Sequence, residues 1–107
     1  MASFYKNAKV DLTTTGATTL YTAPAATTAI FKSLLVADDS GSTSTITVTI
    51  TDSAAAVFVL YNVKATTANG TAELLTQPLV IQESEVLKVT AANANRLHVI
   101  GSFLEMT

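Results

Sequence analysis

The chain has 107 residues, a net charge of −2 and a charged fraction of 13%, about half of the roughly 25% usual in soluble domains. Its six basic residues are scattered along the sequence, which argues against direct binding of nucleic acid, because such binding needs a concentrated basic face. Cysteine is absent, so a disulfide scaffold is excluded. The length is that of a single domain, residues 1–107, which can bury a core without disulfides or metal.

Polar residues interrupt every apolar run, so no stretch approaches the ~18 uninterrupted apolar residues of a membrane helix. The N-terminal sequence MASFYKNAKVDL lacks the apolar segment of a signal peptide. We therefore expect a soluble protein without membrane contact, made in a cytoplasm and not exported by that route.

Apolar and polar residues alternate along most of the chain, and this alternation predicts short β-strands. The expected strands span residues 5–12, 18–22, 29–37, 44–51, 56–64, 72–75, 79–81, 86–91 and 97–104. Turn sequences such as TTTG, APAA, DDSGS, TANG and NAN separate them. Together they predict an all-β fold: a single antiparallel β-sandwich, jelly-roll or immunoglobulin-like, with about eight short strands.

Residues 1–9 allow two interpretations. They form either the first strand of the sandwich or a contact arm, in which Phe4 and Tyr5 add a strand to a neighbour or anchor in its groove.

Threonine alternates with isoleucine and valine in the stretch GSTSTITVTITDS, residues 41–53. Threonine is β-branched and favours a pleated sheet, so we expect its hydroxyls on a wet face while Ile46, Val48 and Ile50 pack inward. The rival interpretation is an ice-binding face. That function needs threonine arrays on several neighbouring strands, and the sequence shows one clear row.

Several predicted strands are apolar on both faces, above all AAAVFVLYNV, residues 54–63. Strict alternation puts one set of side chains on one face and a second set on the other: Val57, Val59, Tyr61 and Val63 against Phe58 and Leu60. In the last strand, Leu97, Val99 and Phe103 oppose Ile100 and Leu104. Such strands indicate a surface covered by another subunit. The alternative is a central strand whose outward residues are shielded by loops.

Catalytic, metal and cofactor sites are not indicated. His98 is the only histidine and is expected to be a partly buried packing residue. Asp38 and Asp39 lack the spacing of a calcium loop and predict an Asx-type turn. Glu83 and Glu85 are compatible with an acid–base pair, but an exposed turn before the strand at residue 86 is the preferred interpretation.

Two long stretches carry a resemblance to a known family: LYTAPAATTAIFKSLLVADDSGSTSTITVTITDSAAAVFVLYNVKA and LTQPLVIQESEVLKVTAANANRLHVIGSFLEM. They resemble the small β-sandwich structural proteins of tailed bacteriophages, especially marine and cyanobacterial phages. That family shows a Tyr-x-Ala-Pro turn, a Ser-Leu-Leu-Val-Ala strand, a Thr-Val strand ending in Thr-Asp, and a last strand closing on Leu-Glu. This sequence departs from it at QESEV, where the family has a Gly-Asp turn.

The resemblance implies a non-enzymatic virion protein, made in the host bacterial cytoplasm. The expected role is a capsid decoration or cement protein that bridges neighbouring subunits of the major capsid protein, itself a homo-oligomer with a trimer favoured. The first alternative is that the protein is a neck, tail or fibre-attachment component of the virion. A carbohydrate- or ligand-binding module and a small hydrolase are rivals that the absence of tryptophan and the single histidine argue against. The candidate protein-contact residues are Phe4, Tyr5, Phe58 and Leu60.

Overall fold

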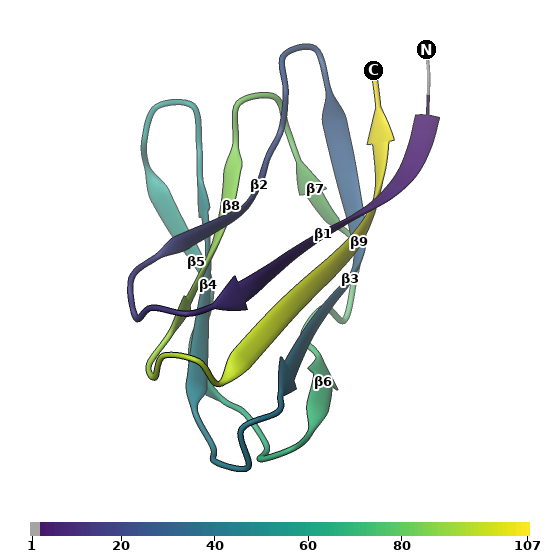
Figure 1. Cartoon of the computed structure of the whole chain (residues 1–107). Coiled ribbons are helices and arrows are strands. Elements are labelled where there is room, and N and C mark those ends of the chain that lie inside the picture. The colour runs from purple at the N-terminus through teal and green to yellow at the C-terminus, as the bar shows by residue number, and fades with distance from the viewer. Residues whose placement is uncertain (1–2) are drawn as a thin grey trace.

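The structure, a computed structural model, describes residues 3–107 and contains nine strands in two antiparallel sheets (Figure 1). The strands are β1 (Ser3–Leu12), β2 (Thr18–Thr22), β3 (Thr28–Asp38), β4 (Thr45–Thr51), β5 (Val57–Ala65), β6 (Thr71–Glu73), β7 (Leu79–Ile81), β8 (Val86–Ala91) and β9 (Leu97–Met106). The first sheet has the order β1-β9-β3-β6, with β7 also paired to β3, and the second has the order β2-β8-β4-β5. The predicted all-β antiparallel sandwich is confirmed. In the described part of the chain no helix is long and apolar enough to cross a membrane.

The pairing of the strands is that of a jelly roll. β4 pairs with β5, β3 with β6 and β7, β2 with β8, and β1 with β9, so the chain folds as one long hairpin. Rolling this hairpin up brings β9 beside β3 and β8 beside β4. β6 and β7 act as one interrupted strand, which gives the eight strands of a jelly roll. Of the two predicted topologies, the jelly roll is therefore the one that forms.

The core lies between the sheets and follows the alternation of the sequence. β8 alternates between half-buried and buried residues along its whole length, and Ile46 and Val48 of β4 are fully buried. At one end of the core three aromatic rings meet. The rings of Phe31 and Phe103 stack with centroids 4.6 Å apart, and Tyr21 packs against both.

The threonines of β4 face outward, as predicted, while Ile46 and Val48 face the core. The expectation of a single threonine row is wrong, because cross-strand register adds threonines from β2 and β8 to the same face. The outward threonines are Thr19, Thr22, Thr45, Thr47, Thr49, Thr51 and Thr90. Lys88 and Val86 separate those of β2 from those of β4, so the threonines form no continuous lattice.

β5 departs from the alternation because its pairing with β4 is irregular. Val48 lies opposite Tyr61, but the next residue, Thr49, lies opposite Val59, so Leu60 is an extra residue in the strand. The bulge lets both Leu60 and Tyr61 pack against the core. The predicted sharing of one face by Tyr61 and Val59 is therefore wrong.

β5 is an edge strand and not the shielded central strand that was considered as an alternative. Val57, Phe58, Val59 and Val63 are each more than half exposed. Val63 also has a φ of 51°, a left-handed conformation that is rare for a β-branched residue. An apolar edge of the second sheet is thus open on both faces.

The QESEV sequence forms the exposed turn that was predicted. The backbone amide of Glu85 donates to the backbone carbonyl of Gln82, and the Glu85 carboxylate accepts from the backbone amide of Gln82 at 2.7 Å. Ser84 has a φ of 67°, the conformation that favours glycine. This chain therefore forms the QESEV turn with a serine in the left-handed region.

Candidate interaction surfaces

His98 lies on the outer face of the first sheet, between two carboxylates. Its Nε2 is 3.2 Å from Asp11 Oδ1, and its Nδ1 is 3.9 Å from Asp39 Oδ2. The ring is partly buried, as expected, but its acidic neighbours were not predicted. The hydrogen bonds of residues 3–107 place no serine or threonine hydroxyl on this ring. Within the same range, no group of three or more His, Cys, Asp or Glu side chains is placed to hold a metal ion.

Asp38 forms the predicted Asx turn. Its Oδ1 accepts from the Ser40 amide at 3.0 Å and from the Ser40 hydroxyl at 2.8 Å. The hydrogen bond from the Ser40 amide is the main reason that the pKa of Asp38 is lowered, and it outweighs the opposing effect of burial. The Asp38 carboxylate therefore stabilises the turn between β3 and β4.

The outer face of the first sheet carries a row of apolar side chains. Tyr5 of β1 lies opposite Leu104 of β9, Leu104 lies opposite Ile30 of β3, and Ile30 lies opposite Val80 of β7. Residues that oppose one another in adjacent strands share a face, and these four point away from the core. Tyr5 is 77% exposed and Val80 48%, while Ile30 and Leu104 are half-buried. We call these four residues the apolar row.

A second, shorter apolar pair lies further along the same face. Ile100 of β9 is opposite Leu35 of β3, with Lys9 on one side and Glu73 on the other. Ile100 is 38% exposed. Between this pair and the apolar row lies a polar row that contains Ser102.

The tip of the β4–β5 hairpin is a second exposed apolar surface. Residues 54–59, with the sequence AAAVFV, are all exposed. We call this segment the knob. Asp52 shapes it, because Asp52 Oδ1 accepts from the amides of Ala54 and Ala56, both at 2.9 Å. Ala55 occupies the left-handed conformation with a φ of 66°, which completes the turn.

The structure places the four predicted contact residues on two edges that do not adjoin in either sheet. Phe4 and Tyr5 lie on β1, at the edge of the first sheet, and Phe58 and Leu60 lie on β5, at the edge of the second. Tyr5 faces outward into the apolar row. Phe4 lies opposite Glu105 and so is on the inward side, although it is 53% exposed. Leu60 is half-buried against the core.

Residues 3–9 belong to β1 and pair with β9 residue by residue. They form the first strand of the sandwich, at an edge where a neighbouring molecule can reach them. Residues 1–2 of the suggested arm lie outside the described residues. Ile30 and Val80 were not singled out from the sequence, because their membership of the row depends on the register of strands far apart in the chain.

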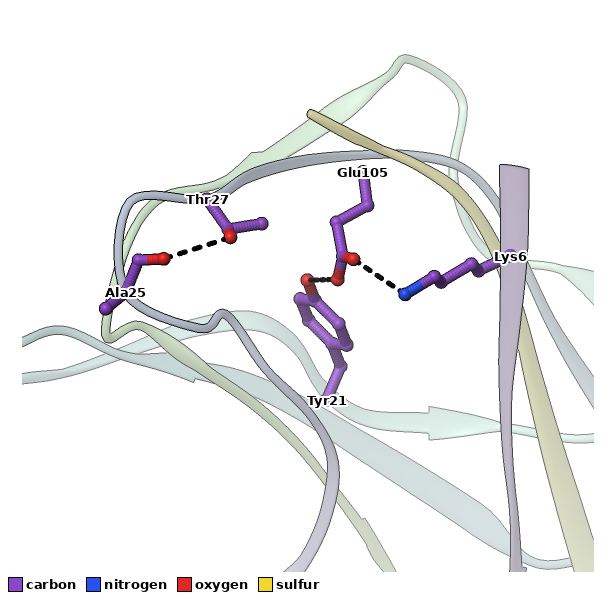
Figure 2. Close-up of polar contacts among 5 residues, drawn as sticks. All are labelled: Lys6, Tyr21, Ala25, Thr27 and Glu105. Atoms are coloured by element: carbon purple, nitrogen blue, oxygen red, sulfur yellow. Dashed lines mark hydrogen bonds and ion pairs between the residues drawn. The ribbon is translucent and has the colours of Figure 1, made fainter. Parts of the chain in front are cut away.

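A buried carboxylate, that of Glu105, links β1 and β2 to β9 near the end of the sandwich where β1 begins and β9 ends (Figure 2). Glu105 is buried, and its Oε1 accepts from Lys6 Nζ at 2.8 Å while its Oε2 accepts from the Tyr21 hydroxyl at 2.6 Å. These two donors hold the pKa of Glu105 below its ordinary value of 4.5, although burial opposes them. Burial and the carboxylate together raise the pKa of Tyr21. Nearby, the buried Thr27 hydroxyl donates to the Ala25 carbonyl (Figure 2).

Glu105→Gln should lower the free energy of unfolding by about 1–2 kcal/mol at pH 7, because both hydrogen bonds lose their charged acceptor. A carboxyl group whose pKa is lowered by folding stabilises the protein above its unfolded pKa and loses that contribution as the pH falls through the folded value. The difference between the wild type and Glu105→Gln should therefore shrink below the ordinary pKa of 4.5. Urea unfolding at several pH values measures it. Glu83→Gln is the control: the Glu83 carboxylate is exposed and accepts a single hydrogen bond, from the Ala26 backbone amide at 2.9 Å, so this variant should change stability less than Glu105→Gln at pH 7. A difference that stays constant from pH 7 to pH 3 would contradict this account.

A scan against protein-family models finds no match to this chain, and a search of curated proteins finds none either.

Proposed function

We propose that this chain is a non-enzymatic structural protein of a phage virion, a capsid decoration protein that bridges neighbouring capsid subunits as a homo-oligomer. The observation that carries the proposal is that one small jelly roll exposes two separate apolar surfaces, the apolar row and the knob. A protein that bridges subunits needs at least two contact surfaces. Monomeric soluble proteins rarely leave large apolar patches exposed without a binding role.

The resemblance to phage β-sandwich proteins supplies the virion context. The physical mechanism is burial of apolar area across the joints between subunits, at about 25 cal/mol per Å² removed from water. The Lys6–Glu105–Tyr21 hydrogen bonds support this mechanism, because they hold β1, and with it Tyr5, in a fixed place. A surface that is already ordered loses less conformational entropy on binding.

The proposal predicts that the purified protein binds phage heads and that each apolar surface is needed. Val80→Asp in the apolar row and Phe58→Asp in the knob should each reduce the bound fraction at least tenfold, because each puts a charge into a contact that excludes water. Both side chains are exposed, so both variants should fold. Co-sedimentation with isolated heads and, separately, with isolated tails measures the binding.

Thr19→Asp is the matched control, since it puts the same charge on an exposed residue of the second sheet, away from both apolar surfaces. It should bind heads like the wild type. Binding to tails alone would replace the capsid role with the neck, tail or fibre-attachment role. Binding to neither particle part would contradict the proposal.

A further inference from the structure

The knob is an ordered projection with a uniform apolar surface. Val57, Phe58 and Val59 are 60%, 58% and 56% exposed, and three alanines precede them. The Asp52 carboxylate is occupied by two backbone amides of the turn, so it fixes the shape of the knob. A run of six exposed apolar residues is unfavourable in water unless something covers it.

The end of the sandwich that carries the knob is acidic. Three connections lie there, residues 23–27, 52–56 and 82–85, at the end where β1 begins and β9 ends (Figure 1). These three loops contain Asp52, Glu83 and Glu85 and no basic residue. Two knobs that met each other would bring like charges together, which disfavours a symmetric contact between them.

One part of the outer face of the first sheet offers what this end lacks, an apolar row with lysines beside it. A shallow depression of about 330 Å³ adjoins the apolar row and is lined by Tyr5, Lys6, Asn7, Lys32, Ser102 and Phe103. Lys6 is paired with Glu105, but no ion pair within residues 3–107 joins Lys9 or Lys32 to a carboxylate. This part of the face thus offers an apolar row, a hollow beside it and two lysines that an acidic neighbour can neutralise. The carboxylates of the same face, Asp11, Asp39 and Glu73, lie further along it, where they contact His98 or the hydroxyl of Ser33.

We propose that the knob of one copy docks on the apolar row and the adjoining depression of a second copy. The inference rests on the proposed function and deepens its homo-oligomer part: these two surfaces join the copies to one another, and the assembled oligomer is what binds the capsid. Phe58 is the side chain suited to the depression, and the acidic loops then lie near Lys9 and Lys32. A contact between two different surfaces is heterologous, so it closes into a ring when the rotation between copies allows.

Cysteine cross-linking tests this arrangement directly, because the chain contains no cysteine of its own. Ser53→Cys puts a thiol beside the knob, and Asn7→Cys puts one in the depression; both positions are exposed. An equimolar mixture of the two variants, one carrying a size tag, is oxidised and the dimers are separated by mass. Mixed dimers should exceed both homodimers at least fivefold.

Thr14→Cys, in the exposed loop after β1, is the control and should give no preferred pair with Ser53→Cys. Homodimers of Ser53→Cys as the main product would show knob-to-knob contact and overturn the proposal, as would homodimers of Asn7→Cys. Equal amounts of all pairs would also overturn it.

Light scattering over a range of concentrations supplies a second test. The wild type should form a closed oligomer, and Phe58→Asp, Val80→Asp and Lys32→Glu should each weaken its association at least tenfold. Added salt should weaken the wild-type association as well. A wild type that stays monomeric up to millimolar concentration overturns this inference. If its binding to phage heads still depends on Phe58 and Val80, the capsid-binding part of the proposed function survives that failure, without the homo-oligomer and with both surfaces contacting the capsid.

Discussion

Phe31→Ala should lower the free energy of unfolding by about 3–5 kcal/mol, the usual cost of removing a buried phenylalanine ring. Phe31 is fully buried. Its ring stacks on that of Phe103 with centroids 4.6 Å apart and packs edge-to-face with that of Tyr21 with centroids 5.4 Å apart. Its removal leaves a cavity between the two sheets and takes away two aromatic contacts. Urea unfolding followed by tyrosine fluorescence and by circular dichroism measures the loss.

Phe4→Ala and Phe58→Ala are the matched controls, because they delete the same ring from positions that are 53% and 58% exposed. Each should change stability by less than about 1 kcal/mol, as surface substitutions usually do. If Phe31→Ala were no more costly than these two, the aromatic cluster would not be the packed core described above.

Gly101→Ala should also destabilise the protein strongly, by about 2–3 kcal/mol, which is toward the upper end for overpacking a core. A Cβ at position 101 would lie 2.5 Å from Cε2 of Phe31 and 3.0 Å from its Cδ2. The Phe31 ring has little freedom to move aside, because Phe103 and Tyr21 hold it. The thermal midpoint should fall with the free energy of unfolding.

Gly16→Ala separates this steric effect from the general effect of replacing glycine. A Cβ at position 16 would meet only Thr14 Oγ1, at 3.9 Å. That variant should be neutral or slightly stabilising, because alanine restricts the unfolded chain more than glycine does. Gly101→Ala should cost less stability when it is introduced into Phe31→Leu than when it is introduced into the wild type, because the smaller leucine leaves room for the new Cβ. Equal costs of Gly101→Ala in both backgrounds would contradict the proposed clash.

The strands could be predicted from the sequence because alternation is a local property. β8 and the inward residues of β4 follow it strictly, and the Asx turn at Asp38 depends on neighbouring residues alone. β5 could not be predicted to the same degree. The bulge at Leu60 depends on how β4 pairs with it, and a shift of one residue reverses the face of every side chain beyond it.

The candidate site shows the same limit. Tyr5 was singled out as an exposed aromatic residue near the N-terminus, but its neighbours in the row come from β3, β7 and β9. Only the register of these pairings brings them together. The knob was partly visible in the sequence, as an apolar run with Phe58 in it. Its exposure was not, because that depends on β5 lying at an edge of the second sheet.

The nested pairing of the strands has a consequence for how the protein is made. β9 lies between β1 and β3 in the first sheet, so the strand synthesised last joins two strands synthesised early. β1 has no partner in its sheet, and β3 has partners on one side only, until β9 has been synthesised. Contacts between residues so distant in sequence also form slowly. The first sheet can therefore not close before β9 has been synthesised, and until then the partner edges of β1 and β3 are open to non-native pairing.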